Sequence, residues 1–328
     1  MRKINRIILA LGIWLVLSAI PVYAAEWRWI DMDLDGYCEC YYFDNDNEVF
    51  LKNRLTPDGY QLNDNGAWVV DGVVQTRERI PHGQAEGSIQ TTAGKLDEGA
   101  VKTSQLSKLN YWLYTPENSK ESMPLILFLH GHGMPSMSQL KGEIRFAELM
   151  NHARTQDSAY VLAPLLPPEL DLGAKGMWPG IEPSILELLE SVVETCKIDR
   201  NRIYVVGNSM GADSAVQIIA NNPDLFAGMV GIVPFHEKCP MKRWEDGWGD
   251  KFKSVPTWLF IEDEKSAKQM AQQASEDIKS AGGQAWIDVQ RGADHGNAGK
   301  TVAYNKMPDI YDWLLTLSRP AVPENTAE

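Results

Sequence analysis

Apolar and polar positions change their spacing repeatedly over the greater part of the chain. From about Val101 to Ser318, short apolar runs that are typical of buried strands alternate with longer stretches of helical periodicity. The predicted strands are Tyr111–Tyr114, Leu125–Leu129, Tyr160–Ala163, Ile203–Val206, Gly228–Val233, Trp258–Ile261 and Trp286–Val289. The predicted helices are Ile185–Cys196, Met210–Ala220, Ser266–Ala281 and Met307–Leu317. This alternation predicts one α/β domain over residues 101–318, with a mostly parallel sheet covered by helices on both faces.

A different pattern occupies residues 25–76. Aromatic residues alternate there with polar ones, as in Trp27-Arg28-Trp29, and turn signals recur at Asp35-Gly36, Asp58-Gly59, Asn65-Gly66 and Asp71-Gly72. Both features are typical of short β-hairpins, so we expect a small β module. Residues 77–100 are polar and rich in glycine without sustained periodicity, which predicts a linker, and residues 319–328 are expected to form a tail.

The first residues have the pattern of a targeting segment. Arg2, Lys3 and Arg6 precede an apolar stretch from Ile7 to Ile20, and small residues follow around Ala24. This predicts a signal peptide over residues 1–24, because the apolar stretch is shorter than the roughly 20 residues that a spanning helix needs. We therefore expect a secreted or cell-surface protein, without a membrane association after cleavage.

Composition and charge narrow the classes of partner. With 44% hydrophobic and 23% charged residues the chain has ordinary globular usage, which excludes a disordered protein. The formal charge of −13 at pH 7 would repel phosphate backbones and anionic lipids, so nucleic acid is not an expected partner. The four cysteines predict no disulfide framework: a ring closed between Cys38 and Cys40 would be strained, and Cys196 and Cys239 are expected at opposite edges of the sheet.

The clearest chemical motif is Gly207-Asn208-Ser209-Met210-Gly211, which lies between a predicted strand and a predicted helix. A nucleophile elbow needs small residues two positions before and after the nucleophile, because the sharp turn brings backbone segments close together. We therefore predict that Ser209 is a nucleophile.

A second motif follows the apolar strand Leu125–Leu129, which leads into His130-Gly131-His132-Gly133. Backbone N–H groups of such a loop and of the residue after the nucleophile form an oxyanion hole, here those of His132 and Met210. The alternative is that His130 and His132 bind a metal, for which the sequence offers no evident third ligand. No metal and no cofactor are expected.

The base and the acid should follow Ser209 in chain order, and His295 lies where the base belongs, in a loop after Trp286–Val289. The other downstream histidine, His236, is expected to line the substrate pocket together with Trp178. For the acid, Glu262, Asp263 and Glu264 follow one strand consecutively, and the residues alone do not decide among them.

These elements resemble the α/β-hydrolase superfamily. In particular, Tyr-Trp-Leu-Tyr-Thr-Pro, Leu-His-Gly-His-Gly and Ile-Asp-Arg-Asn-Arg-Ile-Tyr-Val-Val-Gly-Asn-Ser-Met-Gly look like secreted esterases of the polyhydroxybutyrate-depolymerase and feruloyl-esterase type. The resemblance implies a serine esterase with a Ser-His-Asp triad and a substrate of plant-polysaccharide or polyester origin. Counting back from Ala281-Gly282-Gly283, it places the acid at Asp263, although the usual His-Gly-x-x-Asp segment is replaced by Ile-Glu-Asp-Glu. The alternatives are a prolyl-oligopeptidase-type peptidase and a non-catalytic wall-binding protein.

The N-terminal module has its own resemblance. Its segments Trp-Arg-Trp-Ile-Asp, Asp-Gly-Tyr-Cys-Glu-Cys-Tyr-Tyr-Phe and Thr-Pro-Asp-Gly-Tyr resemble cell-wall-binding repeats of the choline- and glucan-binding type, which implies a cell-wall polymer as partner. The alternative is a structural β cap. Asp31, Asp33, Asp35 and Gly36 match the opening of an EF-hand loop, but Tyr42 stands where the loop needs a bidentate Glu, so calcium is not expected.

Overall fold

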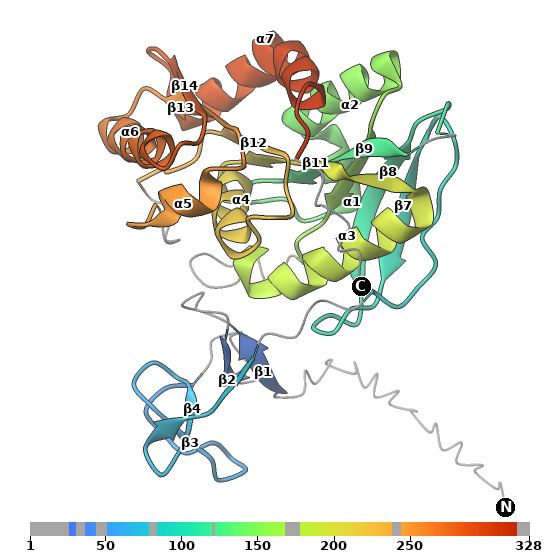
Figure 1. The fold of residues 1–328 in the computed structure, drawn as a ribbon. Coiled ribbons are helices and arrows are strands. Elements are labelled where there is room, and N and C mark those ends of the chain that lie inside the picture. The colour runs from blue at the N-terminus through green and yellow to red at the C-terminus, as the bar shows by residue number, and fades with distance from the viewer. Residues whose placement is uncertain are drawn as a thin grey trace, which may run out of the picture.

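A computed structural model describes residues 26–30, 37–43, 51–78, 84–119, 122–167, 178–237 and 244–319. Its main feature is an eight-stranded sheet in the order β14-β13-β12-β11-β9-β10-β8-β7 (Figure 1). The strands are β7 Lys95–Val101, β8 Leu109–Thr115, β9 Met123–Leu129, β10 Tyr160–Pro164, β11 Ile198–Asn208, β12 Gly228–Ile232, β13 Thr257–Glu262 and β14 Ala285–Gln290. From β10 to β14 every neighbouring pair is parallel, and β8 pairs antiparallel with both β10 and β7. The predicted mostly parallel sheet is thus confirmed.

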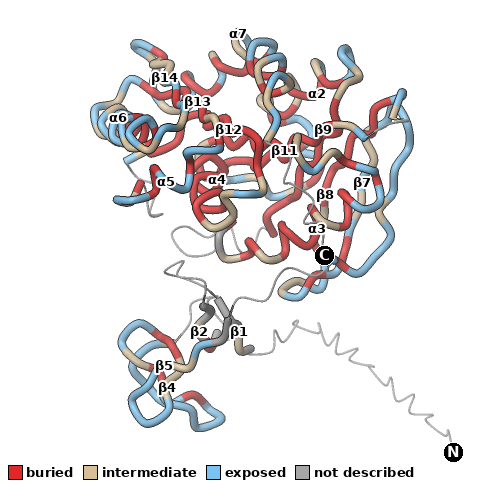
Figure 2. The backbone as a smooth tube through the Cα atoms, in the orientation of Figure 1, coloured by how far each residue is buried: buried red, intermediate tan, exposed pale blue. Residues whose placement is uncertain are grey.

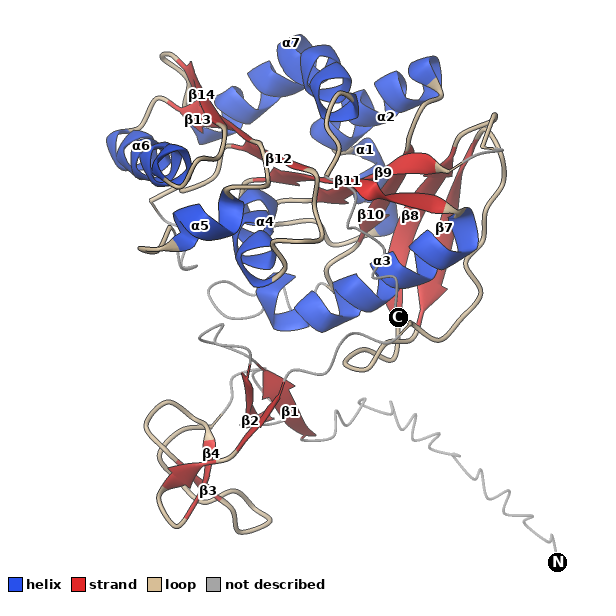
Figure 3. Cartoon of the chain, viewed as in Figure 1, coloured by secondary structure: helices blue, strands red, loops and turns tan. Residues whose placement is uncertain are grey.

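Helices cover both faces of this sheet (Figure 3). One face carries α1 Met137–Gly142, α2 Ile144–Gln156 and α7 His295–Leu315; the other carries α3 Glu182–Cys196, α4 Met210–Asn221, α5 Trp248–Phe252 and α6 Lys265–Ser280, with the short 3-10 helix Trp178–Ile181 beside α3 and α4. Along β9, Leu125, Leu127 and Leu129 belong to one core, and Ile126 and Phe128 belong to the other. A strand covered on both sides is apolar at every position, which is why the central strands are buried throughout (Figure 2).

The expected linker differs from the structure at its C-terminal end. Residues 95–100 form most of β7, and Ala85 already joins the main core, where its N–H donates to Glu187 and Ser191. Because β7 is the edge strand and only Val101 in it is buried, its sequence is largely polar and lacks the apolar run by which the inner strands are identified.

The last helix also begins earlier than expected. It runs from His295, not from Met307, and it contains Pro308 in its interior. Asp294 caps its start by accepting a hydrogen bond from the N–H of Asn297, at 2.9 Å. Gly296 and Gly299 lie in its first turns, and the low helix propensity of glycine is the reason why the sequence did not indicate this start. His295 is consequently the first residue of a helix and does not lie in a loop.

The small N-terminal module consists of two antiparallel sheets. One contains β1 Glu26–Ile30, β2 Tyr37–Phe43 and β6 Thr76–Glu78, and the other contains β3 Gln61–Leu62, β4 Trp68–Val70 and β5 Val73–Val74. The rings of Trp27, Tyr42, Tyr60 and Trp68 pack against one another with centroids 5.1–5.9 Å apart. The predicted β-hairpin module is therefore present.

Several predictions fall outside the described residues: the signal peptide, the Asp31–Gly36 loop, most of the tail, the side chain of Cys38, and Cys239. Cys196 is a free thiol, and burial raises its pKa to about 12. Among the described residues no helix is long and apolar enough to cross a membrane.

Candidate active site

Ser209 lies on a sharp turn between β11 and α4. Its backbone has φ 53° and ψ −119°, a conformation that an L residue adopts only at a free-energy cost. The turn is possible because its glycines lie against other backbone: a Cβ atom at Gly207 would be 2.4 Å from the carbonyl oxygen of Gly211, and one at Gly211 would be 2.0 Å from that of Leu129. The motif therefore has the geometry of a nucleophile elbow, with the Ser209 side chain half-exposed at its tip.

We expect Gly211→Ala to destabilise the protein by roughly 3 kcal/mol or more, because the new methyl group would force the elbow away from backbone atoms of β9. Gly142→Ala is the matched control: its Cβ would meet nothing within 4 Å, so the loss of helical flexibility should make it neutral or slightly stabilising. Urea unfolding of the two variants tests this. Equal midpoints would contradict the close approach at the elbow.

The base predicted from the sequence reaches the nucleophile. The Nε2 atom of His295 lies 2.8 Å from Ser209 Oγ, although the two residues are 86 positions apart in the chain. In the neutral imidazole this nitrogen accepts a hydrogen bond from the hydroxyl group, because Nδ1 carries the proton of the ring and donates on its other side. The pair thus has the geometry of a serine activated by a general base.

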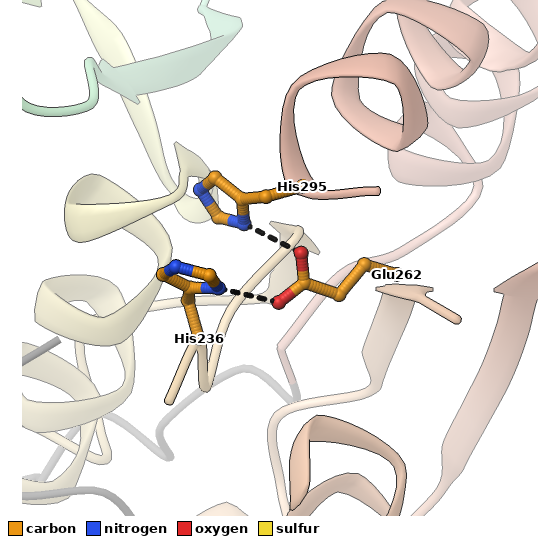
Figure 4. Close-up of side chains that lie close together, drawn as sticks. All are labelled: His236, Glu262 and His295. Carbon is orange, nitrogen blue, oxygen red and sulfur yellow. Dashed lines mark hydrogen bonds and ion pairs between the residues drawn. The ribbon is translucent and has the colours of Figure 1, made fainter. Parts of the chain in front are cut away.

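The carboxylate that meets His295 belongs to Glu262, the last residue of β13 (Figure 4). Its Oε2 atom accepts from His295 Nδ1 at 2.9 Å, and its Oε1 atom accepts from His236 Nδ1 at 2.7 Å. The Glu262 side chain is 2% exposed, so the two imidazoles hold a carboxylate that is almost fully withdrawn from water.

The family resemblance implied that Asp263 is the acid, and the structure corrects this expectation. Asp263 does not face His295. Its Oδ1 atom accepts from Lys268 Nζ at 2.6 Å, and its Oδ2 atom accepts from the N–H of Gly292 at 2.8 Å. These contacts lower the pKa of Asp263 and hold it at the surface. The third candidate, Glu264, caps α6 by accepting from the N–H groups of Ser266 and Ala267.

The electrostatics of the site keep His295 neutral. Burial lowers the pKa of His295 below its ordinary 6.5; the charge of Glu262 opposes this shift, and the nearby His236 and Arg145 add to it. A neutral imidazole is the form that accepts a proton from serine. The lowered pKa therefore favours the form of His295 that acts as a base.

The loop after β9 lies directly against the elbow. A Cβ atom at Gly131 would be 3.3 Å from Ser209 Cβ and 2.9 Å from Asn208 Nδ2, so the loop that contains His132 borders the nucleophile. On the other side, Met210 is the first residue of α4, where backbone N–H groups point out of the helix end. Both backbone segments expected to form an oxyanion hole are thus next to Ser209.

Trp178 and His130 support this loop from inside. Trp178 is fully buried, so the expectation that it lines an open pocket is wrong; its Nε1–H donates to the carbonyl oxygen of His130 at 3.0 Å. The His130 ring donates from Nδ1 to the Gly131 carbonyl and accepts at Nε2 from the N–H of Leu166. Both ring nitrogens are therefore engaged, which contradicts the alternative of a metal at His130 and His132.

Among the described residues one group of metal-ligating side chains lies close together, and it is formed by His236, Glu262 and His295, with ligand atoms within 4.8 Å of one another. A metal on these atoms would have to displace the hydrogen bonds between the imidazoles and the carboxylate. The arrangement as it stands therefore favours proton transfer over metal binding.

The expectation that His236 lines the substrate pocket did not include its hydrogen bond to Glu262. The only sequence signal was its position after β12, at the same sheet edge as Ser209 and Glu262.

Solved structures of known proteins share this fold. The chain superposes on a thermostable esterase with a TM-score of 0.55 and 21% identity over 68% of this chain, spanning 63% of the length of that esterase. It superposes on a ferulic acid esterase with a TM-score of 0.52 and 14% identity, covering 66% of this chain and 97% of the other. A protein named as a dipeptidyl aminopeptidase IV from Bacteroides ovatus gives a TM-score of 0.52 and 13% identity over 89% of this chain and 43% of its own. No protein-family model and no curated protein matches the chain. At these identities the likeness shows the fold, which is that of an α/β-hydrolase.

Proposed function

We propose that this protein is a serine esterase that hydrolyses carboxylic esters through an acyl-enzyme. The observation that carries the proposal is the continuous chain of hydrogen bonds from Ser209 Oγ through His295 to Glu262, at 2.8 and 2.9 Å, which begins at a nucleophile elbow. The esterase names of the first two structural neighbours support it. Relative to the expected Ser-His-Asp triad, Glu262 takes the place of the aspartate.

In the first half-reaction Ser209 Oγ attacks the ester carbonyl carbon while His295 Nε2 takes the hydroxyl proton. The carbonyl oxygen becomes an oxyanion, which the backbone N–H groups of His132 and Met210 would stabilise. Glu262 stabilises the imidazolium and fixes Nδ1 as its protonated nitrogen. His295 then donates its proton to the departing alcohol, which leaves the acyl group on Ser209. In the second half-reaction water attacks the acyl carbonyl carbon while His295 Nε2 takes a proton from it. His295 then returns this proton to Ser209 Oγ as the bond between Oγ and the acyl group breaks, which releases the acid and restores the serine.

We also propose that the protein is secreted and that its aromatic module contacts a surface polymer, as the sequence patterns imply. The packed rings of Trp27, Tyr60 and Trp68 support the second point, because Tyr60 is 44% exposed and could stack on a sugar or a choline cation. The substrate would then be an ester of plant-polysaccharide or polyester origin held near that polymer.

The direct test is turnover of p-nitrophenyl acetate and butyrate by the purified full chain, together with labelling by a fluorophosphonate probe. We expect hydrolysis of both esters and stoichiometric labelling of Ser209, located by peptide mass spectrometry. Chromogenic prolyl and alanyl peptide substrates, assayed beside them, should give no turnover. Faster cleavage of a peptide than of any ester would make the protein a peptidase, and absence of labelling in the folded protein would overturn the proposal.

A further inference from the structure

We propose that His236 is a positioning residue for the triad. It fixes the orientation of the Glu262 carboxylate relative to the His295 ring, so that the site is a Ser-His-Glu-His tetrad. The inference rests on the proposed esterase function and deepens it. A pocket-lining histidine would be expected to direct its polar atoms toward substrate, whereas His236 uses Nδ1 to donate to the acid.

The first support is the geometry of the shared carboxylate. Glu262 accepts from one imidazole at each oxygen, and the rings of His236 and His295 stack with centroids 4.2 Å apart and planes 32° apart. Figure 4 shows both Nδ1 atoms directed at Glu262 and both remaining ring nitrogens directed away from it. A carboxylate held at both oxygens cannot rotate about its last bond without breaking a hydrogen bond. The orientation that Glu262 presents to His295 therefore depends on His236.

The second support is the way the chain delivers His236. Val233 and Phe235, just before it, have φ values of 48° and 64°, which a β-branched and a bulky residue rarely adopt. Asp213 on the first turn of α4 holds this loop, because its Oδ1 atom accepts from the N–H of Phe235 at 2.7 Å. Asp213 is 2% exposed. The helix that directly follows Ser209 thus holds the loop that contains His236. The nucleophile elbow and the position of His236 are therefore linked through Asp213.

The third support is electrostatic. The titratable and charged groups that face His295 are Glu262 from β13, His236 from the loop after β12 and Arg145 from α2. Glu262 raises the pKa of His295, and His236 and Arg145 lower it. By engaging the other oxygen of Glu262, His236 also reduces the pull of that carboxylate on a proton at His295. Loss of His236 should therefore raise the pKa of His295. As the pH is lowered, the variant should then lose activity at a higher pH than the wild type does.

His236→Phe and His236→Asn separate these effects. Phenylalanine keeps the ring stack and removes the hydrogen bond, whereas the asparagine side-chain amide can still donate to Glu262. We expect kcat on p-nitrophenyl acetate to fall about 10-fold or more in His236→Phe, with KM within about twofold, because a small misplacement of the base slows proton transfer. His236→Asn should recover most of kcat. We expect the acid limb of kcat/KM below pH 6.5 in the wild type, because burial lowers the pKa of His295, and it should move to higher pH in His236→Phe and less in His236→Asn.

His152→Asn on α2 is the control and should leave kcat and the pH profile unchanged. The proton NMR signal of the His295 Nδ1–H should shift in His236→Phe even if this variant is less stable than the wild type. His236→Asn provides a second variant that is expected to remain folded. A change confined to KM, or an unmoved acid limb with unchanged kcat, would overturn the inference. Such results beside normal fluorophosphonate labelling would leave the esterase proposal standing, whereas failure of labelling in the wild type would remove both.

Discussion

Ser209→Ala should reduce kcat/KM for p-nitrophenyl esters by roughly 10⁴-fold or more and abolish labelling by a fluorophosphonate. The expected loss is large because the hydroxyl is the only group that forms the acyl bond; residual turnover would come from the oxyanion hole and substrate binding alone. Only the bond to His295 Nε2 is removed, so the thermal unfolding midpoint should stay close to that of the wild type. Assays of ester turnover, labelling and unfolding on one preparation test this prediction.

Ser280→Ala is the matched control, since it removes a hydroxyl from an exposed position at the far end of α6. It should leave turnover, labelling and stability unchanged. If Ser209→Ala retained more than a few per cent of wild-type turnover, another nucleophile would have to act, and the hydrogen-bond chain through His295 would lose its proposed role.

The nucleophile and the base could be predicted from the sequence because local sterics and chain order determine them. Gly207 and Gly211 are required wherever a strand turns sharply into a helix, since any Cβ at these positions would collide with backbone. His295 follows the last strand, and His236 is the only other histidine after Ser209 in the sequence. These features depend on a few consecutive residues, so a single sequence carries them.

The acid could not be predicted in the same way, because three consecutive carboxylates follow β13 and the backbone decides which one points inward. Glu262 still pairs with Gln290 in the sheet, and the chain turns after it, with the N–H of Asp263 donating to Ala293. The turn carries Asp263 toward Gly292 and Lys268. Glu264 caps α6, but no sequence signal marked it, because Ser, Thr, Asp and Asn are the usual residues at that position.

The contact between His236 and Glu262 could not be predicted from the sequence either. His236 follows Val233 and Phe235, which both adopt left-handed backbone conformations, and the buried carboxylate of Asp213 on α4 accepts from the N–H of Phe235. Residue preferences argue against such conformations for valine and phenylalanine. The surrounding structure therefore determines this part of the site, and it departs from local preference where the proposed chemistry takes place.

Glu262→Ala should lower kcat by about 10³-fold to 10⁴-fold, whereas Asp263→Asn should change it by less than about twofold. Without Glu262 the imidazolium formed during acylation loses its counter-charge, and Nδ1 of His295 is no longer fixed as the protonated nitrogen. Asp263 instead contacts Lys268 and Gly292, and the asparagine oxygen can still accept from the Gly292 N–H. Steady-state turnover of p-nitrophenyl acetate by the two variants measures the difference.

Glu262→Gln refines the comparison, since it keeps the size of the side chain and removes its charge. The amide has one oxygen and one NH₂ group, so it can accept from only one of the two Nδ1–H groups that Glu262 now receives. If the amide oxygen faces His295, the NH₂ group must donate to His236, whose tautomer then changes; the opposite orientation leaves His295 in the wrong tautomer. We therefore expect a kcat between those of the wild type and Glu262→Ala, with a loss of at least about 10²-fold, because both orientations lack the negative charge. A variant pattern in which Asp263→Asn is inactive and Glu262→Gln is active would return the acid to Asp263 and contradict the site described.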